Sequence, residues 1–326
     1  VPSAMATSLS LTEVAALKAE ISSAKKTSMN SVRRLLTLMR ETQRKDAQLV
    51  STHGDAFLKS SAIKSVPDEE RFLIYEQVAI AACECGDVEV ADRCVSRLES
   101  RFPGSIRAGR LRGMVEEASG DIDGARATYA KLLQEHPSSQ MVLKRMVAIE
   151  RTAGDLQSAI KALNHFLNHY MADADGWAEL ADLYLEAGMH KQAAFCLEEL
   201  ILIQPHTFCH HLRLGETLLS YATNLEEKLV AYKHLCTACE LCAGAHPRVL
   251  WSLLACVSSM ASKKAGASSS GRGGATAAME EIDVNVARLA SKQLKKLYAK
   301  ADPDLAATAQ AAVLDMLGDI PDCLDD

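Results

Sequence analysis

Residues 174–205 read ADGWAELADLYLEAGMHKQAAFCLEELILIQP, and they contain two helical patterns separated by Gly188. The large apolar residues recur at helical spacing on both sides of this glycine: Trp177, Leu180, Tyr184, Leu197 and Leu200. Such spacing places the apolar side chains on one face of each helix. Glycine is common where a helix ends, because it adopts the left-handed conformation at little cost. The stretch therefore predicts two helices joined by a short turn.

The helix-ending and small residues of this stretch recur along the chain every 34 residues, and we call them the punctuation of the repeat. The first series consists of Gly86, Gly120, Gly154 and Gly188. The second series consists of Ala91, Ala125, Ala159 and Ala193. The third consists of Pro103, Pro137 and Pro205, with Met171 at the remaining position. Only 17 of the 326 residues are glycine, so composition alone does not account for four glycines in register. The period indicates structural repeats.

A repeat of 34 residues with this punctuation is typical of the tetratricopeptide pattern. Each unit is expected to hold two helices that cross closely at the alanine, with proline stopping the second helix. A small residue is also expected in the first helix, where the sequence has Ala79, Gly113, Ala181 and Gly215, whereas Val147 departs from the pattern. We therefore predict an all-α fold, a tetratricopeptide-repeat α-solenoid in which helix pairs form a right-handed superhelix with helical caps.

The punctuation also predicts how the chain is organised. In the fifth unit the second helix is delayed by about four residues, so that Ala231 takes the alanine position. Helical patterns over 11–25, 30–41 and 47–59 precede the repeats, and patterns over 280–300 and 303–317 follow them. The predicted parts are an N-terminal helical cap (1–68), four repeats (69–205), degenerate repeats (206–262), a flexible Gly/Ser linker (263–279) and C-terminal capping helices (280–326).

Composition and charge narrow the possible functions. The formal net charge of −6 disfavours broad binding of nucleic acid, which requires a basic surface. No apolar run in the sequence reaches the roughly 20 residues of a membrane-spanning helix, and no signal peptide is visible at the start. Ten cysteines without regular spacing are typical of a reducing compartment. The sequence also lacks the nucleotide-binding and hydrolase motifs. We expect a cytoplasmic protein that is not an enzyme and has no cofactor.

Two clusters of cysteine and histidine nevertheless raise the possibility of a metal site. Cys236, Cys239 and Cys242 are flanked by histidines, but a continuous helix spreads three such residues along a drifting stripe, so core packing is favoured over a metal. The second cluster comprises His206, Cys209, His210 and His211. Partly solvated side chains are the favoured interpretation there.

The first helices of the repeats are expected to line an inner groove. The residues predicted to face a partner are Arg107, Arg110, Met114, Lys144, Arg151, Asp175 and Asp182. Either these are ordinary solvated charges, or a basic patch adjoins an acidic one and binds an extended or helical peptide. The groove lacks the asparagines of the carboxylate clamp found in cochaperones, which disfavours a receptor for chaperone tails.

Several stretches outside the repeat punctuation resemble the second subunit of the endoplasmic reticulum membrane protein complex. They are Ile74–Val78, Phe102–Ser105, Gly113-Met114 with Glu117-Ala118, Leu133–Glu135, Ala178–Tyr184, Ala193–Leu200 and Gln204–His206. The likeness is strongest from Tyr75 to His206 and also includes His53-Gly54. The Gly/Ser stretch and the cysteine-rich helix depart from the family pattern.

The resemblance implies a non-catalytic scaffold subunit that is peripheral on the cytosolic face of the endoplasmic reticulum membrane. Members of the family help to organise an insertase for transmembrane segments, including tail anchors. Their partners are the cytosolic ends of membrane subunits and a further soluble subunit, so membrane association is indirect. Two alternatives remain open: a stand-alone cytosolic peptide receptor or cochaperone, and a metalloprotein or enzyme that uses the Cys236 cluster.

Overall fold

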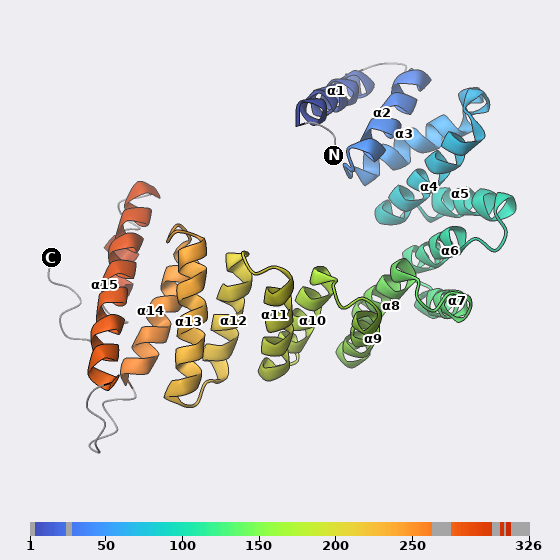
Figure 1. Cartoon of the computed structure of the whole chain (residues 1–326). Helices are drawn as coiled ribbons and strands as arrows, with labels where there is room; N and C mark the ends of the chain where they lie inside the picture. The colour runs from blue at the N-terminus through green and yellow to red at the C-terminus, as the bar shows by residue number, and fades with distance from the viewer. Residues whose placement is uncertain (1–3, 24–27, 263–274, 302–306, 310, 314–326) are drawn as a thin grey trace. The chain divides into compact units, whose positions relative to one another are not determined.

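The computed structural model describes residues 4–23, 28–262, 275–301, 307–309 and 311–313. All regular structure within these residues is helical (Figure 1). The chain divides into two compact units, Val1–Ala162 and Leu163–Asp326, and α9 (Leu156–His169) crosses the boundary between them. The predicted all-α tetratricopeptide-repeat solenoid is thereby confirmed as the fold class.

The first unit contains three N-terminal helices followed by repeat helices. They are α1 (Ala4–Ser23), α2 (Met29–Glu41), α3 (Ala47–Lys59), the 3-10 helix η1 (Ser61–Ser65), α4 (Asp68–Cys85), α5 (Val88–Arg101), α6 (Ile106–Ser119), α7 (Ile122–Glu135) and α8 (Gln140–Thr152). Helix α4 packs on α5, and α6 packs on α7. The first helices of successive repeats, α4, α6 and α8, also contact one another, which is the arrangement of stacked helix pairs.

The second unit continues with helix pairs. They are α10 (Ala174–Glu186), α11 (His190–Ile203), α12 (Phe208–Tyr221), α13 (Leu225–Leu241), α14 (Pro247–Ser262) and α15 (Ala275–Ala301). Helix α10 pairs with α11, α12 pairs with α13, and α14 packs on both α13 and α15. The helix predicted over 303–317 lies mainly outside the described residues. Of the linker predicted over 263–279, residues 263–274 lie outside them, whereas 275–279 belong to helix α15.

The punctuation residues occupy the places that their chemistry predicts. The four glycines of the 34-residue series have φ between 71° and 86°. Gly86 and Gly120 are the C-caps of first helices, and Gly154 and Gly188 each follow the C-cap of a first helix. The four alanines of the series are fully buried where helices cross. Pro103, Pro137 and Pro205 each follow the end of a second helix by two residues, and Met171, which replaces proline, is 70% exposed.

The small residues of the first helices allow the second helices to approach closely. A Cβ added to Gly113 on α6 would lie 2.3 Å from the ring of Tyr129 on α7. In the fifth repeat, a Cβ on Gly215 would lie 2.7 Å from the side chain of Leu235. Ala231 is fully buried in α13, as the delayed second helix predicts. That delay accompanies a capping box formed by Asn224 and Glu227 at the start of α13.

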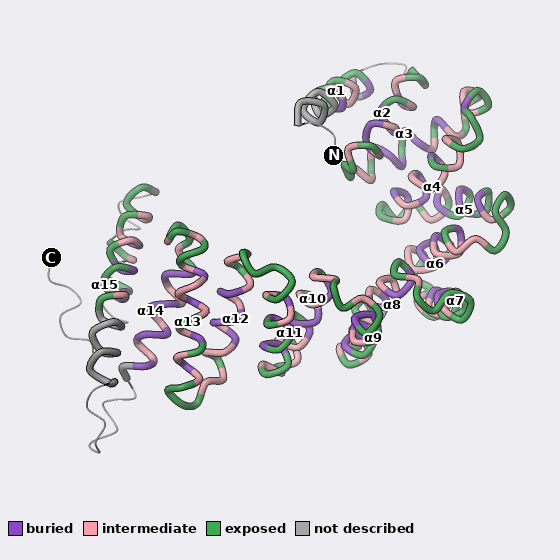
Figure 2. The backbone as a smooth tube through the Cα atoms, in the orientation of Figure 1, coloured by how far each residue is buried: buried purple, intermediate pink, exposed green. Residues whose placement is uncertain are grey.

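Buried residues alternate with exposed ones along the helices, as expected where one face of a helix packs on its neighbours (Figure 2). In the first unit, one apolar cluster joins α1 through α6, and a smaller cluster around Tyr129 joins α6, α7 and α8. In the second unit, a cluster joins α12, α13, α14 and α15. Each helix pair thus covers apolar surface of the next pair, which is how repeat arrays gain their stability.

Candidate protein-interaction surface

The two predicted groove arginines of α6 form ion pairs with the preceding first helix, α4. Arg107 donates a hydrogen bond to the carboxylate of Glu76, and the guanidinium of Arg110 lies 3.6 Å from the same carboxylate. The Arg107 side chain is 67% exposed, whereas the Arg110 side chain is only 14% exposed. Met114 is buried against the core of the first unit. Of these three residues, Arg107 therefore presents the largest surface to a partner.

A second ion pair joins α8 to α6 and is partly buried. Arg145 donates two hydrogen bonds to Glu117, including one of 3.0 Å from Nε to Oε1. The hydroxyl of Tyr129 donates to the same Oε1 atom at 2.6 Å. Burial of the ring, and then the hydrogen bond to Glu117, raise the pKa of Tyr129 well above its ordinary range. These contacts hold α6, α7 and α8 together.

The other predicted groove residues lie on α8 and α10. Lys144 is half-buried and Arg151 is exposed, both on α8 of the first unit. Asp175 and Asp182 are exposed on α10 of the second unit, where Asp182 accepts a hydrogen bond from Arg213 of α12. The basic and acidic residues thus belong to different units, and their adjacency stays a prediction.

Ion pairs of the same kind recur beyond these positions. In the second unit, Arg248 donates two hydrogen bonds to Glu216, at 2.9 and 2.7 Å, and so links α14 to α12. In the first unit, Arg33 of α2 contacts Glu70 of α4, and this hydrogen bond lowers the pKa of Glu70. Sequence reasoning missed the carboxylate partners. One signal was available, because Glu76 and Arg110 are 34 residues apart and carry opposite charges.

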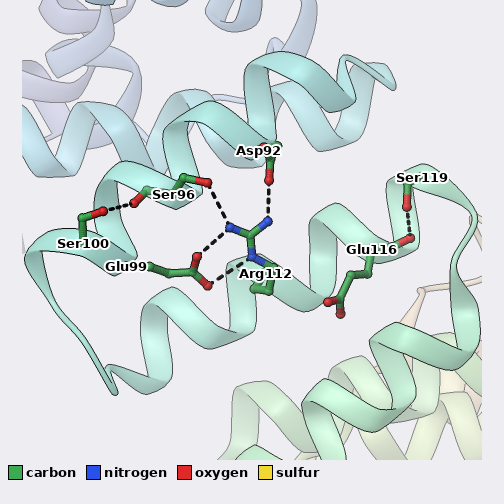
Figure 3. Close-up of polar contacts among 7 residues, drawn as sticks. All are labelled: Asp92, Ser96, Glu99, Ser100, Arg112, Glu116 and Ser119. Atoms are coloured by element: carbon green, nitrogen blue, oxygen red, sulfur yellow. Dashed lines mark hydrogen bonds and ion pairs between the residues drawn. The ribbon is translucent and has the colours of Figure 1, made fainter.

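Arg112 ties α6 to α5 through the largest polar network described for this surface. Its guanidinium donates to Glu99 through two nitrogens, at 3.1 and 2.6 Å, and also contacts Asp92 (Figure 3). A further hydrogen bond of 3.2 Å reaches the hydroxyl of Ser96. The hydrogen bond to Glu99 makes the largest contribution to raising the pKa of Arg112, which keeps the guanidinium charged. Glu116, one turn further along α6, has a buried Oε2 atom without a hydrogen-bond partner among the described residues.

An apolar pocket of about 260 Å³ lies between α4, the end of α5 and the start of α6. We call it the apolar pocket after its apolar lining, which consists of Phe72, Leu73, Leu98, Phe102, Ala108 and Leu111. The polar residues of its lining are Glu69, Glu76, Ser105 and Arg107. Phe72 and Phe102 meet edge to face, with ring centroids 5.1 Å apart. Leu73 and Phe102 are 38% and 42% exposed. Exposed aromatic side chains beside a pocket are typical anchor sites for a partner.

The second unit has an aromatic pocket of its own, with a volume of about 530 Å³. Trp177 of α10 and Phe195 of α11 meet edge to face across it, and Phe195 is 53% exposed. The indole of Trp177 donates a 2.7 Å hydrogen bond to the carbonyl of Met171, which fixes the ring at the helix start. This pocket offers a second surface for apolar side chains.

The cysteine cluster packs against the core of the second unit. Cys236, Cys239 and Cys242 all contact that apolar cluster, and burial is the main cause that raises the pKa of Cys239. Core packing, the interpretation favoured from sequence, is thereby confirmed. In the described part of the chain, no three histidine, cysteine or acidic residues are placed to hold a metal ion.

In the second cluster of histidines and cysteine, the predicted partial solvation holds for some residues and not for others. His206 and Cys209 are exposed, and His210 is half-buried. For His211 the expectation of partial solvation is wrong, because the side chain is only 8% exposed. Its Nε2 atom lies 3.1 Å from the carbonyl of Pro205, and its Nδ1 atom lies 3.3 Å from Nδ1 of His234.

Within the described residues, no helix combines the length and the apolar character needed to cross a bilayer.

Comparison with known proteins places these features in context. Residues 100–225 match the family described as the EMC2 TPR-like repeat domain. ER membrane protein complex subunit 2-A of Xenopus laevis is 33% identical over 280 residues, which cover 85% of this chain and 90% of that protein. TPR repeat protein oca3 of Schizosaccharomyces pombe is 34% identical over 175 residues, covering 53% of this chain and 62% of that protein.

A solved structure supports the fold independently of sequence likeness. The C-terminal part of a TPR repeat-containing protein from Cytophaga hutchinsonii superposes with a TM-score of 0.56 at 13% identity. The match covers 85% of this chain and 98% of that structure.

Proposed function

Because the chain belongs to the family of ER membrane protein complex subunit 2, we propose that it is a non-catalytic scaffold subunit of that complex. The observation that carries the proposal is the likeness to the Xenopus laevis protein over 90% of that protein's length. The likeness therefore extends well beyond the repeat punctuation, which any tetratricopeptide protein shares. Fold alone does not specify a partner, so the assignment rests on this longer likeness.

The finer parts of the proposal concern location and partners. We place the chain on the cytosolic face of the endoplasmic reticulum membrane, where it holds the cytosolic ends of membrane subunits and a further soluble subunit. In this role it organises an insertase for transmembrane segments, including tail anchors. Exposed side chains along the first helices, such as Arg107, Arg151 and Asp175, suit contacts with such partners.

The scaffold proposal is tested by purifying the native assembly. The chain carries an affinity tag in its own cells, membranes are solubilised in mild detergent, and the material is sized and identified by mass spectrometry. We expect a large assembly that contains membrane subunits. A tagged chain found only as a small species that binds short C-terminal peptides would contradict the scaffold and favour a stand-alone receptor.

The groove is tested separately by reversing two exposed charges, Arg107→Glu and Arg151→Glu. Arg110 is left intact because its side chain is only 14% exposed and supports the fold through Glu76. The matched control reverses two exposed lysines of the same unit, Lys131→Glu and Lys161→Glu. We expect the first variant to lose association with the assembly and the control to keep it. Equal association in both would remove the groove contact and leave the scaffold proposal standing.

A further inference from the structure

A pocket of about 540 Å³ lies between η1, the start of α4 and the end of α5. We call it the basic pocket. Four cations contribute to its lining, namely Lys64, Arg71, Arg97 and Arg101, and Asp68 is the single carboxylate. The whole chain has a formal net charge of −6, so this excess of cations is local. A pocket lined in this way attracts a ligand that brings carboxylates or other anions.

Two cations of the basic pocket lack the carboxylate partners that several arginines elsewhere in the first unit have among the described residues. Arg33, Arg112 and Arg145 each bind a carboxylate of a neighbouring helix. By contrast, Lys64 and Arg97 are exposed and form no ion pair with any described residue. Their ammonium and guanidinium groups therefore have hydrogen-bond donors available to a ligand.

Arg71 and Arg101 are both held in place by neighbouring residues, and Arg101 keeps its donors available. Arg71 lies 3.1 Å from Asp68 and donates a 2.9 Å hydrogen bond to the carbonyl of Val66, yet its buried Nε atom has no partner among the described residues. The guanidinium of Arg101 lies over the rings of Phe72 and Phe102, 5.9 and 5.5 Å from their centroids. This stacking orients Arg101 and leaves its N–H groups for an acceptor.

Phe72 connects the basic pocket to the apolar pocket, because its ring lines both. A bound segment that crosses this ring therefore meets two environments. The apolar pocket accepts a hydrocarbon or aromatic side chain against Phe102 and Leu98. The basic pocket accepts carboxylates from the neighbouring residues of the segment.

We propose that these two adjoining pockets bind an acidic segment of a partner protein, in which aspartate or glutamate residues flank one apolar or aromatic anchor. The charge excess selects the carboxylates, and the apolar pocket selects the anchor. A nucleic acid would instead require an extended basic surface, which the formal net charge of −6 disfavours. The inference goes beyond the scaffold function, since it concerns direct peptide binding by this chain in any assembly.

The experiment uses the purified full chain as bait for a displayed library of random 12-residue peptides. Peptides that also bind the Lys64→Glu/Arg97→Glu variant are removed by counter-selection. We expect the remaining peptides to contain at least two acidic residues beside an apolar residue. Lys131→Glu/Lys161→Glu is the matched control, with the same change in charge on the same unit, and it should retain the selected peptides.

Affinities of a selected peptide, measured by fluorescence anisotropy, complete the test. Each single reversal in the basic pocket should weaken binding about tenfold or more, as expected for loss of a charge-assisted hydrogen bond. Replacing a peptide glutamate by lysine should restore part of the binding to the Arg97→Glu variant. Phe72→Ala should weaken the binding of peptides with an aromatic anchor more than the binding of peptides without an anchor.

Three results would overturn the proposal. The first is a selection without peptides that depend on Lys64 and Arg97. The second is a set of enriched peptides with no excess of acidic residues. The third is displacement of the peptide by a few millimolar inorganic phosphate, irrespective of its anchor, which would mark a phosphate site instead.

Discussion

Gly113 on α6 leaves the space that the ring of Tyr129 on α7 fills, and the Tyr129 hydroxyl reaches beyond it to Glu117 at 2.6 Å. The ring is therefore fixed at both ends. It packs against a residue without a side chain, and it donates to a carboxylate that Arg145 also holds. This contact joins the two helices of the repeat and connects them to the next one.

Gly113→Ala should destabilise the chain by about 2–3 kcal/mol, because the added methyl group overpacks a closed site. Its Cβ would lie 2.3 Å from the ring of Tyr129, which cannot move without losing its hydrogen bond. Gly120→Ala provides the comparison, since a Cβ there meets no atom within 4 Å and only the positive φ of 86° opposes it. That change should cost only about 1 kcal/mol. Urea unfolding followed by circular dichroism measures both, and equal losses would contradict the packing argument.

Arg112→Ala should destabilise the chain more than Arg107→Ala. Arg112 contacts three side chains of α5 and is 25% exposed, whereas Arg107 makes one ion pair and is 67% exposed. Networks of partly buried charges contribute more than exposed pairs, which are worth roughly 0–1 kcal/mol. We expect a loss of about 2 kcal/mol for Arg112→Ala and less than about 0.5 kcal/mol for Arg107→Ala. Thermal or urea unfolding at two salt concentrations distinguishes them, because the exposed pair alone should be screened strongly.

The stability of the chain should fall as the pH drops below about 7, in part because of His234. Burial, and then the neighbouring His211, lower the pKa of His234 from its ordinary value of 6.5. Below that value the unfolded chain binds a proton that the folded chain excludes, so protonation favours unfolding. The stability that neutral His234 contributes to the folded chain is fully present above pH 6.5. It is lost as the pH falls toward the pKa of His234 in the folded chain.

The His234→Asn variant isolates this effect from that of other titrating groups. The quantity to measure is the free energy of unfolding at pH 7.5 and at pH 5.5, for both chains. The unmodified chain should lose more stability than the variant between these values. Parallel losses would show that His234 does not contribute to the pH dependence.

The cysteines should react with iodoacetamide in an order set by burial. Burial raises the pKa of Cys94 and of Cys196 to about 12, so both thiols stay protonated at pH 8 and react slowly. Cys85 and Cys209 are exposed and should be modified first. Mass spectrometry of a short alkylation time course measures the order. Early labelling of Cys94 in the folded chain would show that its helix opens readily.

The repeat fold could be predicted from the sequence because its punctuation acts locally. Gly86 ends a helix through its own backbone conformation, and Ala91 is small wherever two helices cross closely. The ion pairs could be predicted only in part. Arg110 and Glu76 share one register of the repeat, but Arg145 and Glu117 are 28 residues apart and meet only because of the way α6 and α8 lie together.

The pockets and the burial of His211 could not be predicted from the sequence, because they also depend on how the helices lie together. Phe102 follows the end of α5 and gives no periodic signal, and its pocket exists because α4 and α6 supply the walls. His211 of α12 meets His234 of α13, and sequence periodicity gives no measure of how the late start of α13 rotates that helix. Contacts that depend on helix rotation require the structure.

The ion pairs from Arg107 to Glu76 and from Arg145 to Glu117 each join one repeat to its immediate neighbour. Within the first unit, a stretching force applied along the repeats therefore acts on each of these junctions, since the junctions follow one another in series. The softest junction then determines how far the unit stretches, and a docked partner that spans two repeats stiffens the junction beneath it.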